Sequence, residues 1–168
     1  MKTLGLDAST RIVGWSFYEN GIIKDAGFID ISKLETNKEK ALMVISELDK
    51  NPNMCAVTQI NLEAALSGFM GGKTSQQTII LLARFNAVLE YIISEHWKIP
   101  VKLVSVTSAR KKVLGKARIK GMTGKEYVRQ ELPKIRPEIL TFEKKNRNDE
   151  WDKKNEDMYD AVVMSIYL

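Results

Sequence analysis

The chain has 168 residues, of which 44% are hydrophobic and 28% are charged, with a net charge of +5. This length allows one domain with a full hydrophobic core and is too short for two ordinary domains, so we expect a single domain over residues 1–168. No apolar run approaches the span of a membrane helix, which predicts that no membrane is a partner. One cysteine excludes an internal disulfide and fits a reducing compartment. Only Lys2 precedes the first apolar stretch, so we expect no secretion signal and a cytoplasmic protein.

The first half of the chain alternates short apolar runs with turn signals. These patterns predict three strands, a helix and a fourth strand, over residues 3–7, 12–18, 22–31, 37–50 and 55–62. The Asn20-Gly21 pair supplies the positive φ angles of a tight turn, so the second and third strands should form a hairpin. The Asn51-Pro52-Asn53 segment ends the helix.

The second half has more helical spacing. After a glycine-rich stretch over residues 67–74, we expect a long helix, a fifth strand, a helix interrupted by Pro133 and Pro137, and a closing helix, over residues 75–97, 101–106, about 123–132 and from about 155. Residues 143–154 are strongly charged and indicate a solvated connection. Together the elements predict an α/β fold, in which helices flank a mixed five-stranded sheet of three antiparallel strands followed by parallel strands.

Four carboxylates stand where apolar elements end or begin. Asp7 and Glu63 close the first and fourth strands, and Asp157 and Asp160 lie three residues apart at the start of the closing helix. Ligands bind at the carboxyl ends of strands in such sheets, and residues i and i+3 share a helix face, so the four side chains could converge. Carboxylates that share a cleft repel one another, and divalent cations remove this repulsion. Oxygen-only ligands suit Mg2+, with Mn2+ as a substitute, and two such ions can clamp a phosphodiester.

Each acid also has a structural explanation that the sequence leaves open. Asp7 could cap a turn, and Glu63 could begin a surface loop. Asp157 could be a first-turn residue that the helix dipole stabilises. Glu156 competes with Asp157 as a ligand, because positions 156 and 160 also share a helix face.

Positive charge is segregated along the chain. Residues 96–125 include no acidic residue and carry these basic ones: Lys98, Lys102, Arg110, Lys111, Lys112, Lys116, Arg118, Lys120 and Lys125. Such segregation is typical of a surface that binds a polyanion, although a charge run alone is more often a solvated surface. Gly115, Gly121 and Gly124 indicate a loop and helix start that can approach phosphates closely, which favours nucleic acid as the ligand.

Several short motifs follow one another in a defined order. They are Leu4-Gly5-Leu6-Asp7-Ala8-Ser9-Thr10 with Gly14, then Asn61-Leu62-Glu63, Ala83-Arg84, the basic Lys111-Lys112-Val113-Leu114-Gly115 followed by Lys125-Glu126-Tyr127-Val128, and Asp157-Met158-Tyr159-Asp160-Ala161. Over nearly the whole chain this layout resembles the RuvC-type Holliday junction resolvases of the ribonuclease H-like superfamily. One departure is Leu66, which stands where that family often has an aromatic residue, with Phe69 three residues further on.

The resemblance implies a ribonuclease H-like fold with a metal-binding tetrad of Asp7, Glu63, Asp157 and Asp160, which together hold two Mg2+ ions. It also implies that Arg110 and Lys125 take the places of two basic residues near the scissile phosphate, with Lys125 as a catalytic residue. Branched DNA is the implied partner, with contacts expected from Arg110, Lys111, Lys112, Lys116, Arg118, Lys120, Lys125, Phe69 and Lys73. The helix over residues 75–97 would supply much of the interface of a homodimer.

These observations predict a metal-dependent, structure-selective endonuclease that resolves Holliday junctions and other branched DNA by paired symmetric nicks. Two symmetric nicks require two active sites in a two-fold dimer. The sequence leaves open a different ribonuclease H-like activity, on RNA–DNA hybrids or in rRNA processing, and a non-catalytic protein that binds junctions. A sugar-kinase or actin-like ATPase needs two such domains, which 168 residues do not hold. A phage origin is compatible with the compact length and with Leu66, in which case the protein would work in the cytoplasm of the bacterial host.

Overall fold

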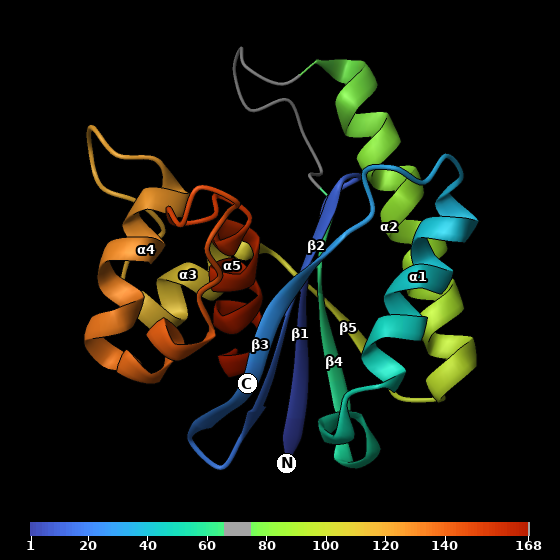
Figure 1. The fold of residues 1–168 in the computed structure, drawn as a ribbon, viewed down its shortest axis with the longest axis horizontal. Helices are drawn as coiled ribbons and strands as arrows, with labels where there is room; N and C mark the ends of the chain where they lie inside the picture. Colours follow the sequence, from blue (N-terminus) through green and yellow to red (C-terminus); the bar gives the residue numbers. More distant parts are fainter. Residues whose placement is uncertain (66–74, 168) are drawn as a thin grey trace.

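The computed structural model describes residues 1–65 and 75–167 of the chain. Five strands form one mixed sheet in the order β3-β2-β1-β4-β5 (Figure 1). They are β1 Lys2–Ala8, β2 Ile12–Glu19, β3 Ile22–Asp30, β4 Gln59–Glu63 and β5 Val101–Val104. The first three strands are antiparallel neighbours, whereas β4 runs parallel to both β1 and β5. The predicted α/β fold with a mixed five-stranded sheet is therefore confirmed.

Helices cover both faces of this sheet. On one side lie α1 Asn37–Asp49 and α2 Gln76–Trp97, and on the other side lie α3 Val106–Leu114, α4 Gly124–Ile135 and α5 Asn155–Ile166 (Figure 1). The helix that contacts β1 and β2 directly is α5, and α3 and α4 pack against α5. The hydrophobic core is accordingly divided into two clusters, one on each side of the sheet.

The central strand β1 determines which face of the sheet each residue serves. All of its residues are buried, and successive side chains point to opposite faces. Leu4 and Leu6 join the core cluster that contains residues of α1 and α2, whereas a Cβ added at Gly5 would meet the backbone of α5. Asp7 lies two residues after Gly5, so its side chain faces α5. Each fully buried leucine contributes about 1.5–3 kcal/mol to stability, which holds β1 in this orientation.

The start of α4 is fixed by a capping box. The Thr123 side chain accepts a hydrogen bond from the Glu126 backbone N–H, and the Glu126 carboxylate accepts one from the Thr123 N–H at 2.7 Å. This reciprocal pair satisfies two backbone donors that a helix start otherwise leaves open. As a result Lys125 lies in the first turn of α4, close to the sheet edge where β1 ends.

Several predicted boundaries were wrong. Residues 52–56 form a 3-10 helix, η1 Pro52–Ala56, so β4 begins at Gln59 rather than at residue 55. Pro52 opens this helix at a position that needs no backbone donor. The fifth strand ends at Val104, and the basic stretch after it forms the helix α3, which the sequence pattern missed.

Pro133 does not interrupt the fourth helix, which continues through it to Ile135. The buried side chains of Val128 and Leu132 anchor this helix on the second core cluster, and tertiary packing of this kind overrides local propensity. Pro137, in contrast, does mark an end, because it opens the separate 3-10 helix η2 Pro137–Phe142.

The expectation that no apolar segment is long enough to span a membrane does not hold for one helix. Within the described residues, α2 is long and apolar enough to cross a membrane by length and composition. In this fold its buried residues, among them Phe85, Leu89 and Ile93, pack against α1 and the sheet. Ile80, Leu81 and Tyr91 of the same helix are exposed.

Candidate active site at the carboxyl ends of β1 and β4

The parallel pairing of β1 and β4 brings the first two acids together. Leu6 and Leu62 are register partners, so Asp7 and Glu63 each follow one residue later on neighbouring strands. Both side chains face α5, since Leu6 and Leu62 belong to the core cluster on the other face. Asp7 is buried, with 6% of its surface exposed. Burial raises the pKa of the Asp7 carboxyl well above its usual value, and the neighbouring Glu63 carboxyl raises it further.

Two glycines allow α5 to approach the sheet closely enough to deliver the other two acids. An added Cβ at Gly14 would lie 2.0 Å from the Asp157 carbonyl oxygen, and one at Gly5 would lie 2.2 Å from the Ala161 carbonyl oxygen. Gly14 is the register partner of Asp7 on the neighbouring strand. The absence of a side chain at Gly14 therefore sets Asp157 against the strand end that carries Asp7.

The far end of α5 is held by a strand side chain. Asn61, on β4, is fully buried and donates hydrogen bonds from its amide to the carbonyl oxygens of Met164 at 2.8 Å and Tyr167 at 2.7 Å. These bonds satisfy carbonyl groups that a helix end leaves without partners. Asn61 and Glu63 lie on the same face of β4, so one strand anchors α5 and supplies an acid beside it.

Two cations lie among the four acids, and each pairs with one acid of α5. Lys125 contacts the Asp157 carboxylate, and its Nζ lies 3.9 Å from Oδ2 of Asp7. Arg110 donates two hydrogen bonds to Asp160, from Nε at 2.9 Å and from Nη2 at 2.6 Å. Asp160 is buried in this pair, and the Arg110 side chain keeps 12% of its surface exposed. The resemblance placed Lys125 and Arg110 near a phosphate, and the structure places both at the acids.

The electrostatic balance favours the charged form of both cations. Burial alone would lower the pKa of Lys125, but the Asp7 and Asp157 carboxylates outweigh it and the net pKa is raised. For Arg110 the same contest between burial and the Asp160 carboxylate also leaves the pKa raised. The site therefore presents four carboxylates with two permanent positive charges between them.

The position of Arg110 depends on a glycine as well. A Cβ added at Gly124 would lie 2.0 Å from Nη1 of Arg110, so a side chain at this position would displace the guanidinium from the start of α4. The sequence suggested that Gly124 lets the chain approach phosphates, whereas the structure shows it accommodating Arg110. Gly115 and Gly121 adopt positive φ angles of 80° and 83°, which explains glycine at those two positions.

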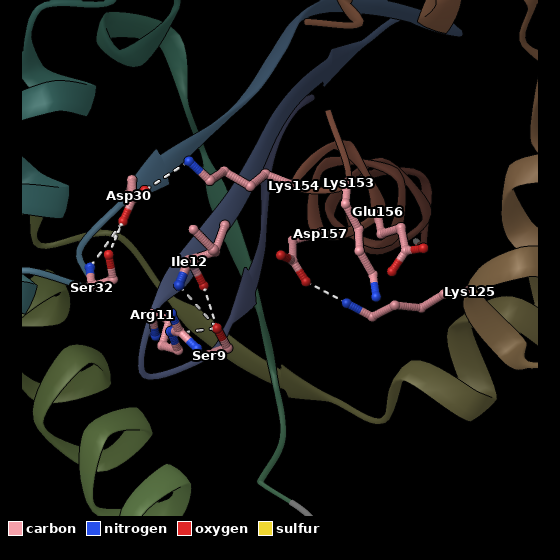
Figure 2. Close-up of a pocket in the computed structure, with 10 residues that line it drawn as sticks. All are labelled: Ser9, Arg11, Ile12, Asp30, Ser32, Lys125, Lys153, Lys154, Glu156 and Asp157. Atoms are coloured by element: carbon pink, nitrogen blue, oxygen red, sulfur yellow. Dashed lines mark hydrogen bonds and ion pairs between the residues drawn. The ribbon is translucent and has the colours of Figure 1, made fainter. Parts of the chain in front are cut away.

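The donor set fits a hard divalent cation, since all four predicted ligands offer carboxylate oxygens. Among the described residues, however, no group of three or more Asp, Glu, His or Cys side chains is arranged to hold an ion. Asp157 and Asp160 are instead satisfied by Lys125 and Arg110. Coordination of a metal by this tetrad therefore requires these two acids to exchange their cation partners. Asp157, rather than Glu156, makes the contact with Lys125 (Figure 2).

The predicted DNA-binding residues fall into separate groups. Arg110, Lys111, Lys116 and Arg118 line a hollow of about 580 Å3 between α3 and the start of α4. Lys112 points elsewhere, with its ammonium 4.8 Å from the centre of the Tyr167 ring. Lys120 is exposed in the connection before α4. Phe69 and Lys73 lie outside the described residues.

A second hollow lies beside the acids, and the sequence patterns did not predict it. It has a volume of about 380 Å3 and shares Lys125 and Asp157 with the carboxylate site. Its other lining residues come from the β1–β2 turn, the end of β3 and the start of α5: Ser9, Arg11, Ile12, Asp30, Ser32, Lys153, Lys154 and Glu156 (Figure 2). No local motif signals it, because the three segments meet only in the folded chain.

No protein-family model and no curated protein sequence matches the chain. Among solved structures, T. thermophilus RuvC in complex with a Holliday junction substrate is similar with a TM-score of 0.63 and 12% identity, over 98% of this chain and 90% of that one. Another Thermus thermophilus RuvC structure gives 0.61 and 13% identity, over 98% and 91%. The yeast mitochondrial Holliday junction resolvase Ydc2 gives 0.61 and 16% identity, over 97% and 75%. The chain therefore has the ribonuclease H-like fold of the RuvC-type Holliday junction resolvases.

Proposed function

We propose that the protein is a divalent-metal-dependent endonuclease that nicks four-way junctions and other branched DNA. The observation that carries this proposal is the convergence of Asp7, Glu63, Asp157 and Asp160, from three distant segments, at one end of a RuvC-like sheet. A second observation supports a nucleic-acid substrate. The hollow lined by Lys111, Lys116 and Arg118 adjoins the acids through Arg110.

In this proposal the four carboxylates hold Mg2+ or Mn2+, whose oxygen preference matches the donor set. Bound there, two such ions would supply activation of water and stabilisation of charge on the phosphodiester. The remaining roles belong to side chains. Lys125, already charged and beside Asp7, is placed to neutralise the negative charge that grows on the phosphate during cleavage. Arg110 is a positioning residue, because its two hydrogen bonds fix the Asp160 carboxylate.

Resolution of a junction needs two symmetric nicks, so we propose a two-fold homodimer. The exposed apolar side of α2, which includes Ile80, Leu81 and Tyr91, is the surface proposed to meet a second copy. Leu81→Glu should give a monomer in sedimentation velocity, because it places a charge in an apolar interface. Leu140→Glu, an exposed leucine on η2, is the matched control and should leave the dimer intact. If the wild type sediments as a monomer at micromolar concentration, this part of the proposal is wrong.

The test of the function is a cleavage assay on defined substrates. End-labelled four-way junctions, three-way junctions, linear duplexes and RNA–DNA hybrids are incubated with Mg2+, with Mn2+ or with EDTA, and the nicks are mapped. The proposal predicts paired nicks in opposite strands of the four-way junction, only with metal. Cleavage of the hybrid alone would assign a different ribonuclease H-like activity. Binding of junctions without cleavage in either metal would indicate a non-catalytic protein.

A substitution at the first acid separates catalysis from binding. Asp7→Asn keeps the size of the side chain but removes a charged ligand, so cleavage should fall by a factor of about 1,000 or more, as for the loss of a residue that acts in the transition state. Junction affinity should change little. Asp149→Asn is the matched control, since Asp149 is exposed and Asn tolerates its positive φ of 62°. Equal cleavage by both variants would exclude Asp7 from the active site.

A further inference from the structure

The hollow between the β1–β2 turn, the end of β3 and the start of α5 has a firmly built frame. Ser9 Oγ donates to the Ile12 carbonyl at 2.8 Å and accepts from the Arg11 and Ile12 N–H groups. The Arg11 carbonyl accepts from Ile31 N–H at 2.9 Å, and the Thr10 carbonyl accepts from Lys40 Nζ at 2.9 Å. The backbone that carries Arg11 is therefore fixed from the turn itself, from the end of β3 and from α1.

The negative charge on the floor of this hollow is already compensated. Asp30 accepts hydrogen bonds from the Ser32 backbone and hydroxyl at 3.0 and 2.6 Å, and Lys154 Nζ lies 2.8 Å from its Oδ2 (Figure 2). These partners hold the pKa of Asp30 below its usual value, with the Lys154 contact as the largest cause. Asp157 is likewise paired, with Lys125. Glu156 is the one further acid that lines the hollow.

Two cations of the hollow remain available to a ligand. The side chains of Arg11 and Lys153 are exposed, and neither makes a hydrogen bond or ion pair with another of the described residues (Figure 2). Arg11 stands on the β1–β2 turn and Lys153 lies two residues before the start of α5, so they border the hollow from different segments. A planar guanidinium and an ammonium are groups that bind phosphate oxygens. The Ser9 and Ser32 hydroxyls already donate to the Ile12 carbonyl and to Asp30, so the two cations are the donors that face a ligand.

We propose that this hollow binds a backbone phosphate of the DNA strand that flanks the phosphate at the carboxylate site, with Arg11 and Lys153 as its ligands. The inference rests on the proposed function and adds a second anchor to it. Lys125 and Asp157 line both the hollow and the carboxylate site, so a strand can pass from one to the other. The basic hollow next to α3 reaches the acids through Arg110 instead. The DNA would therefore be held on two sides of the acids.

The first test measures junction affinity with EDTA present, so that no cleavage occurs. Arg11→Ala combined with Lys153→Ala should weaken binding by about tenfold at moderate salt, because two phosphate contacts are lost. The slope of log affinity against log salt concentration should fall by about one for each contact. Lys24→Ala combined with Lys33→Ala removes the same charge from exposed positions that do not line the hollow and is the matched control.

The second test identifies the phosphate. Single methylphosphonates, which are uncharged, replace each phosphate in turn around the junction branch point, and the loss of affinity is measured. At one flanking position, a methylphosphonate should weaken binding by the wild type. At the same position it should leave the affinity of the Arg11 and Lys153 double variant unchanged. The double variant should keep its sensitivity at positions held by the hollow that contains Lys111 and Lys116.

The outcomes separate this inference from the function on which it rests. If the double variant and the control bind equally well, while the wild type nicks junctions, the hollow is not a phosphate site and the proposed function stands. The same conclusion follows if the double variant stays sensitive at every methylphosphonate position. If the wild type neither binds nor nicks branched DNA, both the function and this ligand assignment are wrong.

Discussion

At the scale of single residues, the central feature is the pairing of each helix acid with a cation. Lys125 contacts Asp157 and Arg110 contacts Asp160, so each of these carboxylates is paired with a positive charge. An unpaired buried carboxylate is unfavourable, and a charged partner stabilises it. We therefore expect that metal loading and release of Lys125 from Asp157 are coupled, and that an arriving phosphate offers Lys125 a new partner.

Lys125→Gln tests this coupling without reference to activity. An ammonium about 4 Å from a carboxylate is worth about 1–4 kcal/mol, depending on solvent exposure. Its removal should let DNA-free protein bind Mn2+ about tenfold or more tightly, as measured by the electron paramagnetic resonance of free Mn2+. Cleavage of junctions should fall at the same time. Lys134→Gln, which removes an exposed lysine paired with Glu131, is the control and should leave Mn2+ affinity unchanged. An unchanged affinity in Lys125→Gln would show that Lys125 does not compete with the metal.

At the scale of elements, the geometry of the site depends on how closely α5 approaches β1 and β2. Gly14→Ala places a methyl group against the Asp157 backbone. Overpacking of this kind lowers the free energy of unfolding by about 1–3 kcal/mol, and it should displace Asp157 from Asp7. Cleavage should fall at least tenfold under conditions where circular dichroism shows folded protein.

Gly27→Ala is the matched control for that displacement. Its added Cβ would meet the side chain of Trp15 at 2.8 Å, on β2, rather than helix backbone. A side chain can adjust more easily than a packed helix, so the loss of stability in urea unfolding should be smaller and cleavage should persist. Equal cleavage by the Gly14 and Gly27 variants would show that the close approach of α5 does not set the site.

The elements that the sequence predicted well are those whose local pattern and packing agree. Short apolar runs and the Asn20-Gly21 turn identified the antiparallel strands, and the parallel pairing of β1 with β4 puts Asp7 and Glu63 at neighbouring strand ends. The helix α3 was missed because its basic surface dominates its composition and Ala109 is its one buried residue.

The rest of the site could not be predicted, because it depends on contacts between segments distant in sequence. The pairing of Arg110 with Asp160 spans 50 residues, and no local pattern signals it. The same holds for the hollow that joins Arg11 to Lys153. Gly14 was noticed as part of a motif, but the backbone that excludes a side chain there belongs to α5.

At the scale of the whole molecule, the sheet separates two core clusters with different roles. The cluster with α1 and α2 supports the outer surface proposed for dimerisation, and the cluster with α3, α4 and α5 supports the acids and both basic hollows. For the proposed dimer, this division predicts that the two carboxylate sites work as separate units. It also predicts that loss of one site leaves the other intact.

Mixed dimers test this separation. Wild-type protein mixed with an excess of Asp7→Asn should form dimers with one working site, and a four-way junction should then receive one nick instead of two. The measurement is the ratio of singly nicked to resolved junctions on native and denaturing gels. If the amount of fully resolved junction is instead proportional to the fraction of wild-type subunits, a single site makes both nicks.

Anomalous diffraction from crystals of the wild-type protein grown with Mn2+ tests the proposed metal site directly. Manganese peaks are expected among the carboxylates of Asp7, Glu63, Asp157 and Asp160, with Lys125 moved away from Asp157. Crystals in which Lys125 and Arg110 keep their pairing with Asp157 and Asp160, and no manganese lies among the four acids, would contradict the proposed metal site if the same preparation nicks junctions with Mn2+.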